Sequence, residues 1–383
     1  MADNKGMAKA KNNKNDEFYT VYDEIQKELN HYEKHFENKI VFCNCDDPYE
    51  SNFFQFFVRN FNYLKLKRLI CTCFAGSTVS CTQLSIFDDE NNLLTNKNGY
   101  VIDISEVPMA NGRGVTDMDI MNLLKSKKRG VKKLIGDGDF RSEECIDYLR
   151  ITDIVVTNPP FSLFKEYMAQ LVKYNKKFLV ISNMQTIKYK EIFPLILNGQ
   201  LGAGYSFNKT MEFIMQDRYE LKGKAYVDSL GRKHGFVPGI CWLTNLDVEK
   251  RHESINLHKY YNSEVYKKYD NYDAIEVDEV NNISQDYSGN MGVPISFLER
   301  YNPDQFELIG SSDISDTLDG ITSLGAEWIK KYREQGGTGH YTANMKSVGF
   351  SGNGKHKIIF SRLIIRNKNQ KKGWKIEWKS HKN

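Results

Sequence analysis

The sequence lacks the features that mark membrane and secreted proteins. Its 383 residues contain no apolar run long enough to span a bilayer, and the chain starts with a polar stretch rich in lysine and asparagine rather than an apolar signal core. The seven cysteines are an odd number, which argues against a secreted disulfide framework. Two cysteine pairs have C-x-C spacing, which suits reduced packing on one strand face better than zinc. We therefore expect a cytoplasmic protein without a membrane partner.

Several common catalytic signatures are also absent. The eight histidines show no metal-ligand spacing, so no metal is expected. The sequence has no G-x-S-x-G motif for a serine nucleophile and no G-x-G-x-x-G loop for a nucleotide. The glycine-bearing stretch Cys73–Ser77 follows the second predicted strand, and we interpret it as a turn. Serine catalysis, metal catalysis and the common nucleotide-binding loop are therefore not favoured.

The composition is that of a folded protein with an uneven charge distribution. Hydrophobic residues make up 40% and aromatic residues 13% of the chain, and its length allows two to three domains. The formal net charge is only +4, yet residues 354–383 hold ten lysines and arginines and one acidic residue. Such a basic segment could neutralise DNA phosphates, or it could be a solvated tail.

A short strand followed by two prolines is the most informative stretch. Ile154–Thr157 are β-favouring residues, and the strand must end at Asn158 because Pro159 and Pro160 cannot donate hydrogen bonds to a sheet. Each proline also holds the residue before it in an extended conformation. Ser162 can then cap an amphipathic helix. The sequence predicts a strand, a rigid loop and a helix.

This loop suits the methylation of an amino group on a planar base. Such a nitrogen is a poor nucleophile because its lone pair is delocalised into the ring. The side-chain oxygen of Asn158 and the carbonyl of Pro159 could accept its two N–H hydrogens and stabilise the charge that develops in the transition state. Phe161 could stack on a base that has left the duplex. The alternative interpretation is an ordinary loop between a strand and a helix.

Predicted strands and helices alternate from residue 40 to residue 197, and the last of these helices is expected at 189–197. This alternation indicates an α/β fold with a doubly wound, mostly parallel sheet. In such sheets a ligand binds beyond the carboxyl ends of the strands. Three of these ends carry polar or motif residues: Asp46 with Asp47, Asp137 with Asp139, and Asn158-Pro-Pro-Phe161. We therefore predict that these groups converge on one edge of the sheet.

The pattern also predicts the domain organisation. Residues 1–15 form a basic mobile arm, and residues 16–250 form the Rossmann-like domain, with an insert at 77–132 that decorates the sheet. After residue 201, antiparallel strands should close the sheet edge. Residues 251–383 form a target-recognition region with a basic C-terminal tail, and a strand is expected at 357–366.

Two of the convergent groups have competing interpretations. In Gly136–Phe140, glycines allow a ligand to approach, an aspartate can accept hydrogen bonds from the amine of an adenine, and the phenyl ring can cover that adenine. A glycine-rich surface turn is the competing interpretation. Asp46 can bind ribose hydroxyls or an amino-acid group of a cofactor, or it can cap the next helix together with Ser51.

With these residues in place, the chain resembles the EcoRI-type family of adenine-specific DNA methylases. The similarity covers about residues 15–310. It is carried by Asn15-Asp-Glu-Phe-Tyr-Thr20, Val41-Phe-Cys-Asn-Cys-Asp-Asp-Pro48, Gly136-Asp-Gly-Asp-Phe-Arg-Ser142, Asp153-Ile-Val-Val-Thr-Asn-Pro-Pro-Phe-Ser-Leu-Phe164, Trp242-Leu-Thr-Asn-Leu-Asp247, Lys268-Tyr-Asp-Asn-Tyr-Asp-Ala-Ile275 and Met291-Gly-Val-Pro-Ile295.

The resemblance implies methyl transfer from S-adenosylmethionine to N6 of a flipped adenine at a specific site in double-stranded DNA. It implies a catalytic motif formed by Asn158, Pro159, Pro160 and Phe161. It also implies a set of cofactor-binding residues, namely Phe18, Thr20, Asp46, Pro48, Asp137, Asp139 and Phe140. Which of the two aspartates contacts the adenine of the cofactor stays open.

Other functions are compatible with an Asn-Pro-Pro motif. An amino-methyltransferase could act on cytosine N4, on RNA adenine or on a protein glutamine. A DNA-binding protein could also retain the motif as a vestige. If the first interpretation holds, a cognate restriction endonuclease could share the DNA site without binding to this chain.

Overall fold

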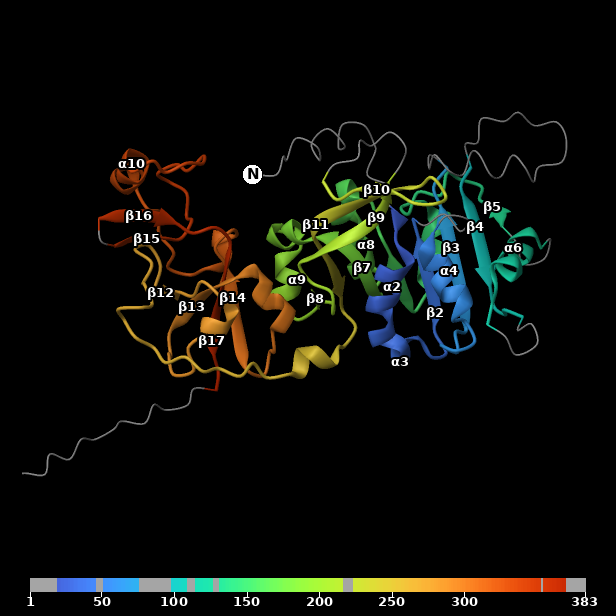
Figure 1. Cartoon of the computed structure of the whole chain (residues 1–383), viewed down its shortest axis with the longest axis horizontal. Helices are drawn as coiled ribbons and strands as arrows, with labels where there is room; N and C mark the ends of the chain where they lie inside the picture. Colours follow the sequence, from blue (N-terminus) through green and yellow to red (C-terminus); the bar gives the residue numbers. More distant parts are fainter. Residues whose placement is uncertain are drawn as a thin grey trace, which may run out of the picture. The chain divides into compact units, whose positions relative to one another are not determined.

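The computed structural model describes residues 19–45, 51–75, 98–108, 114–126, 131–215, 223–352 and 354–369. The chain divides into two compact units (Figure 1). Unit 1 comprises Met1–Thr186 and Gly199–Val248, and unit 2 comprises Ile187–Asn198 and Glu249–Asn383. Within these described stretches, no helix has the length and apolar character that a membrane span requires.

Unit 1 is built on a large mixed sheet of 11 strands in the order β1-β9-β11-β7-β6-β2-β3-β4-β5, with β8 and β10 paired to β11. The four central strands are parallel: β7 (Lys177–Asn183), β6 (Ile154–Thr157), β2 (Ile40–Asn44) and β3 (Arg68–Cys73). The remaining strands are β1 (Tyr19–Thr20), β4 (Tyr100–Ile104), β5 (Lys132–Lys133), β8 (Gly202–Ala203), β9 (Lys209–Met215), β10 (Tyr226–Val227) and β11 (Lys233–Thr244). The predicted α/β class is confirmed.

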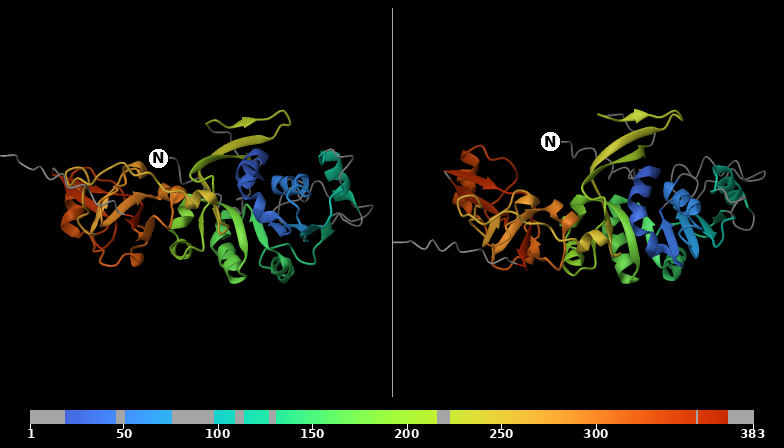
Figure 2. Two further views of the ribbon diagram at one scale, coloured as in Figure 1. Left: turned by 90° about the horizontal axis from the view of Figure 1, so that it is seen from below. Right: turned by 60° about the horizontal axis from the view of Figure 1, so that its bottom comes forward.

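Helices cover both faces of this sheet, as in a doubly wound fold (Figure 2). On one face, α2 (Tyr22–Leu29) and α4 (Asn52–Arg59) pack on β2 and β3. The other face carries α7 (Glu143–Ile151) next to β2 and α8 (Phe164–Lys173) next to β7. Among the described residues, this unit also contains the helices α3 (Glu33–Phe36) and α6 (Asp117–Lys125).

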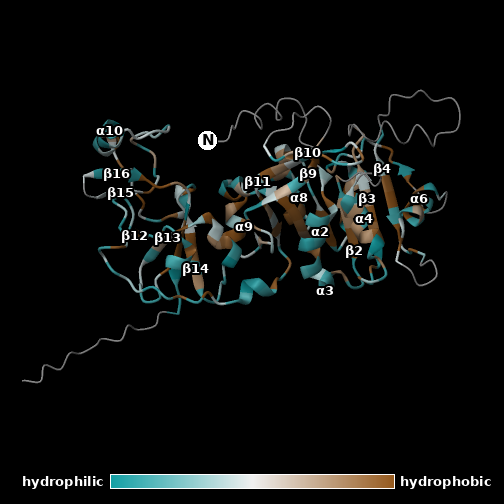
Figure 3. Ribbon diagram, in the orientation of Figure 1, coloured by the Kyte–Doolittle hydropathy of each residue, from teal (hydrophilic) through white to brown (hydrophobic). Residues whose placement is uncertain are grey.

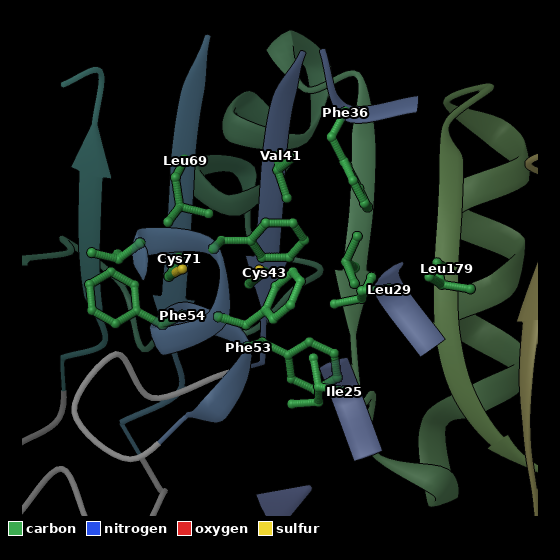
Figure 4. Packing of buried hydrophobic residues seen from close by; sticks show 14 of the residues in the cluster. Ile25, Leu29, Phe36, Val41, Cys43, Phe53, Phe54, Leu69, Cys71 and Leu179 are labelled. Carbon is green, nitrogen blue, oxygen red and sulfur yellow. The ribbon is translucent and has the colours of Figure 1, made fainter. Parts of the chain in front are cut away.

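The core between the sheet and the first helix layer is aromatic and closely packed. Phe53 and Phe54 of α4 lie in one buried cluster with Val41 and Cys43 of β2 and Cys71 of β3 (Figure 4). The helix α4 carries four phenylalanines, Phe53, Phe54, Phe56 and Phe57, and all four are buried. Ser51 caps this helix, with its Oγ accepting from Phe53 N at 3.1 Å. Hydropathy colouring shows the central strands as largely brown and the helices α2 and α3 as largely teal (Figure 3).

The segment after α9 closes one side of the sheet with antiparallel strands, as predicted. β11 pairs with β7 and with β9, and both pairings are antiparallel. The carboxylate of Glu28, fully buried in α2, fastens the turn before β9 because it accepts the backbone N–H groups of Tyr205 at 2.8 Å and Ser206 at 2.7 Å. Burial raises the pKa of Glu28 above its ordinary value.

Three local predictions were wrong. The insert 77–132 does not merely decorate the sheet, because β4 pairs with β3 along five residues and extends it. Ser162 does not cap α8: the helix begins after Leu163, with no side-chain cap, because a 3-10 turn (Phe161–Leu163) follows the prolines. The helix expected at 189–197 is only α9 (Phe193–Leu197), with Pro194 in its first turn.

Unit 2 contains a four-stranded sheet in the order β12-β13-β17-β14 and a separate β15-β16 hairpin. Its elements are β12 (Ala274–Glu276), β13 (Asn290–Pro294), β14 (Phe306–Ser311), α10 (Ala326–Glu334), β15 (Gly349–Gly352), β16 (Lys355–Ile358) and β17 (Arg362–Asn367), together with α9. The single strand predicted at 357–366 is interrupted, because residues 359–361 separate β16 from β17.

Candidate active site

The site lies where the strand order of the large sheet reverses. β2 pairs with β3 on one side and with β6 on the other, and all three strands run parallel. In open α/β sheets a ligand binds beyond the carboxyl ends of the strands at such a reversal, here the ends of β2 and β6. At this edge the buried hydroxyl of Thr157, the last residue of β6, donates to the carbonyl oxygen of Asn44, the last residue of β2.

The Asn-Pro-Pro-Phe loop begins directly at this edge. Asn158 is half-buried with a buried Oδ1 atom, Pro159 is buried, and Pro160 is half-buried. The carbonyl of Pro160 accepts from Leu163 N at 3.0 Å, which closes the 3-10 turn and fixes the loop. Phe161 is half-buried and packs against the core cluster. The four motif residues are therefore held by strand pairing on one side and by a closed turn on the other.

A residue that sequence reasoning treated only as part of a helix face connects the motifs. Tyr167 of α8 is buried, and its hydroxyl donates to Oδ1 of Asn44 at the end of β2. The aromatic rings of Tyr167 and Phe140 form an edge-to-face contact, with their centroids 5.1 Å apart. Tyr167 thus joins the helix after the proline loop to the Gly136–Phe140 loop. A tyrosine at an otherwise apolar helix position was the available signal.

The Gly136–Phe140 loop is fastened to the end of β3. Ala75 N donates to the carbonyl of Asp137 at 2.7 Å. Gly138 has φ +78, and a Cβ atom there would lie 2.3 Å from the carbonyl oxygen of Cys73, so only glycine fits. Gly138 therefore serves the packing of two chain segments. Gly136 differs, because a Cβ atom built there meets nothing within 4 Å.

The two aspartates of this loop have different surroundings. Asp139 forms a two-pronged ion pair with Arg141, with Arg141 Nε at 2.9 Å and Nη2 at 2.6 Å, and these bonds hold the pKa of Asp139 below its ordinary value. Asp137 is exposed, and its Oδ1 accepts from the backbone N–H of Asp139 at 3.0 Å. Asp139 is thus a fixed carboxylate, and Asp137 shapes the turn.

The two apolar side chains of this region, Phe140 and Ile135, differ in burial. Phe140 is the ring that the sequence singled out as able to cover an adenine. Phe140 is buried against Tyr167, whereas Ile135, which the sequence did not single out, is 91% exposed beside Gly136. An isoleucine with so much of its apolar surface in water is unusual for a residue next to a candidate ligand loop.

Thr20 lies at the same carboxyl edge of the sheet. It ends β1, and its carbonyl accepts from Asn52 Nδ2, at the start of α4, at 2.7 Å. Its side-chain Oγ1 is buried and has no hydrogen-bond partner among the described residues. A buried hydroxyl of this kind is costly unless a ligand group completes it. Phe18, Asp46 and Pro48 lie outside the described residues.

Comparison with known proteins decides the family. Residues 6–368 match the family described as adenine-specific methyltransferase EcoRI. The chain belongs to this family. It is 46% identical over 312 residues to the Type II methyltransferase M.EcoRI of Escherichia coli. The match covers 80% of this chain and 89% of that protein.

Two mycoplasma proteins are also similar. Type II methyltransferase M.MgeORF184P of Mycoplasma genitalium is 39% identical over 306 residues, and M.MpnI of Mycoplasma pneumoniae is 37% identical over 306 residues; each match covers 79% of this chain and 84% of the relative. No solved structure matches the chain significantly. The family resemblance drawn from the motifs is confirmed.

The chain is therefore an enzyme, an adenine-specific DNA methyltransferase, and enzymes of this family depend on S-adenosylmethionine. The residues at the carboxyl edge fit such a cofactor. Thr20 offers an unsatisfied hydroxyl, and Asp139 offers a carboxylate that Arg141 keeps ionised. Since each carboxylate oxygen can accept two hydrogen bonds, the ion pair leaves acceptor capacity for an amine.

Proposed function

We propose that the enzyme methylates N6 of an adenine flipped out of double-stranded DNA, with the Asn158-Pro-Pro-Phe161 loop as its catalytic motif. The methyl donor is S-adenosylmethionine, which supplies an activated methyl group when bound. The observation that carries this proposal is the connection of the proline loop, the end of β2 and the Gly136–Phe140 loop through Tyr167 at one edge of the sheet.

Asn158 and Pro159 are proposed to activate the target nitrogen. The Asn158 side-chain oxygen and the Pro159 carbonyl each accept one N–H of the adenine amine, which lets its lone pair leave the ring plane. These bonds strengthen as positive charge grows on the nitrogen. The motif contains no titratable side chain. The proton is therefore expected to leave to water only after methylation has made the nitrogen acidic.

Phe161 and the rigid loop are proposed to hold the flipped base. Stacking on the half-buried Phe161 ring offsets part of the few kcal/mol that flipping costs, by roughly 1–3 kcal/mol. The two prolines and the 3-10 turn fix the acceptors before the base arrives, so little reorganisation is needed during the reaction. Pro160 thus acts by shaping the loop.

The cofactor is proposed to bind beside this loop. Asp139 accepts from the amine of its adenine, and Thr20 and Phe18 hold its methionine part. Asp137 and Phe140 shape the adenine pocket, with Ile135 as its exposed apolar wall. Asp46 and Pro48 are assigned to the cofactor loop after β2 by family resemblance.

The test is methylation-sensitive sequencing of DNA from cells that express the chain, with mass analysis of the digested nucleosides. We expect N6-methyladenine at one short recurrent sequence. This methylation should be absent from the DNA of cells with an empty vector. Methylation at cytosine N4, or no methylated base in cells that contain the folded protein, would overturn the proposal.

We also propose that a restriction endonuclease recognises the same sequence, because the similar proteins are Type II methyltransferases. DNA methylated by this enzyme should then resist cleavage by that nuclease, and the nuclease should not need to bind this chain. Full cleavage of methylated DNA would refute the pairing.

A further inference from the structure

Unit 2 separates its charges along the chain. Residues 249–323 contain 15 acidic and six basic residues, whereas residues 324–360 contain two acidic and six basic residues. We call residues 324–352 and 354–360 the basic lobe. A polyanion would be repelled by the first segment and attracted by the basic lobe.

The basic lobe has its own small core and a firm attachment to the rest of unit 2. Ile329 of α10, Tyr341 and Ile358 of β16 pack together. Asn271, from the acidic segment, binds the lobe through its Nδ2 atom, which donates to the carbonyl of Ser347 at 2.9 Å, and through its Oδ1 atom, which accepts from Gly349 N at 3.2 Å. The lobe is therefore a built surface rather than a loose loop.

Three lysines of the lobe are exposed and available to a ligand. Lys346 precedes the β15-β16 hairpin, and Lys355 and Lys357 lie on β16. Within the described part of the chain, none of them has an acidic partner within 4 Å, in contrast to Lys331, which lies 3.0 Å from Glu327. Exposed lysines without ion pairs are suited to phosphate contact.

The lobe also holds a largely exposed aromatic ring, that of Phe360, whose centroid lies 5.9 Å from that of Tyr341. Phe360 is 72% exposed and follows β16. The next residue, Ser361, has φ +40, a conformation that costs energy for any residue with a side chain. Its buried hydroxyl has no hydrogen-bond partner among the described residues. Both features are unfavourable for the free protein, so they call for a functional reason.

Arg362 fixes this turn from the first position of β17. Its Nη1 atom donates to the carbonyl oxygens of Phe360 at 3.0 Å and Ser361 at 3.4 Å. Its Nη2 atom lies 2.6 Å from Oε1 of Glu276, and both side chains of this pair are largely buried. The same carboxylate accepts the hydroxyl of Tyr269. Phe360 is thus presented by a rigid, clamped backbone rather than by a mobile tip.

We propose that the basic lobe is the surface of unit 2 that binds duplex DNA, with Lys355 and Lys357 at phosphates and the Phe360 ring against a base. This inference rests on the proposed function, which makes duplex DNA the substrate. Lysine ammonium groups supply sequence-independent attraction to phosphates, and an aromatic ring can stack on a base or enter a base step. The acidic segment 249–323 has the wrong charge for the same role.

The lysine contribution can be tested by fluorescence anisotropy with the full chain. The probe is a duplex that contains the methylated site found by sequencing, or a mixed-sequence duplex if sequencing finds no such site. We expect Lys355→Ala/Lys357→Ala to weaken binding at least tenfold at about 0.1 M salt and to reduce the log–log salt slope by nearly two, since each phosphate contact contributes about 0.9. The matched control is Lys259→Ala/Lys267→Ala, which removes two exposed lysines from the acidic segment and should change affinity less than twofold.

The aromatic contribution needs a different comparison. Phe360→Ala should weaken binding about tenfold without changing the salt slope, because stacking releases no counterions, and Phe360→Trp should restore binding. The control is Val265→Ala, which removes an exposed apolar side chain from the acidic segment. Unchanged thermal melting and unchanged cofactor affinity in each variant establish that the fold is intact.

The outcomes separate this inference from the proposed function. Equal affinity losses in the two lysine pairs, or no loss in either, would overturn the phosphate role of the lobe. Wild-type affinity in Phe360→Ala would overturn the stacking role. Variants that bind and methylate DNA like the wild-type enzyme would leave the proposed reaction standing and refute only the basic lobe. A wild-type enzyme that binds DNA through the lobe but methylates no adenine would support the role of the basic lobe and refute the proposed reaction.

Discussion

The two sheets of the molecule are built in different ways. The large sheet of unit 1 has four parallel strands, and each candidate motif is a short continuous stretch that follows one strand. The small sheet of unit 2 places β17, from the end of the described chain, between β13 and β14. Its fastening depends on single polar side chains such as Asn271 and Arg362.

This difference indicates a division of labour. In a parallel sheet the loop after each strand is local in sequence, so catalytic chemistry can be encoded in four or five consecutive residues. The groups of unit 2 that are proposed to contact DNA, Lys355, Lys357 and Phe360, are also close in sequence. The side chains that hold their segment in place, Asn271 and Glu276, are far from them along the chain. The two regions should therefore respond differently to substitution.

The largest effect is expected from Asn158→Ala. Loss of one acceptor for the developing charge should lower kcat by about 10²–10³-fold, in the range measured for single charge-stabilising groups. The measurement is single-turnover methylation of duplex DNA. Cofactor affinity should be unchanged, since Asn158 belongs to the base site, and wild-type turnover would contradict the assigned role.

The next largest effect should be confined to unit 2. Asn271→Ala removes a buried side chain that donates to Thr322 and Ser347 and accepts from Gly349, so its loss leaves buried backbone groups unpaired. We expect the free energy of unfolding of unit 2 to fall by about 2–3 kcal/mol. Hydrogen exchange should rise across the basic lobe and stay constant in β2 and β6. Equal changes in both units would break the comparison.

A smaller effect should distinguish the two aspartates of unit 1. Asp139→Asn weakens the Arg141 ion pair and removes a charged acceptor, and it should raise the Kd for S-adenosylmethionine about tenfold, or about 1.4 kcal/mol. Asp137→Asn keeps the side-chain oxygen that accepts from Asp139 N and should change the Kd less than twofold. Calorimetric titration measures both, and the opposite ranking would exchange their roles.

The smallest effect is a change in pH dependence. Because burial raises the pKa of Glu28, protonation favours the folded state. The protonated Glu28 side chain contributes fully to the free energy of unfolding below the ordinary glutamate pKa, about 4.3. This contribution is lost as pH rises through the pKa that Glu28 has in the folded state. Unfolding measured from pH 4 to pH 8 should therefore show the stability of wild type falling relative to Glu28→Gln as pH rises. A constant difference would contradict this linkage.

The sequence predicted unit 1 well because its signals are local. The strand–proline–helix order and the Ser51 cap follow from neighbouring residues. The structure brings the Asn158 loop and the Gly136–Phe140 loop together through Tyr167, a long-range contact that no local pattern reveals. The pairing of β4 with β3 was missed for the same reason, since the spacing of apolar residues along a strand does not show which strand it pairs with.

In unit 2 the difficulty was greater. The apolar pattern at 357–366 reads as one strand, yet the positive φ of Ser361 breaks it into β16 and β17. A serine does not by itself predict a positive φ. Hydrogen bonds from Arg362 to the carbonyl oxygens of Phe360 and Ser361 hold this conformation. Likewise, the exposure of Ile135 and Phe360 depends on tertiary structure alone.

The position of Tyr167 has a consequence for how the affinities of the two ligands are coupled. Its ring rests on Phe140 in the proposed adenine pocket, and its helix begins at the loop proposed to grip the target base. A shift of this one side chain therefore changes both pockets together. If a bound cofactor tightens the hold on DNA by some factor, thermodynamic reciprocity requires DNA to tighten the hold on the cofactor by the same factor.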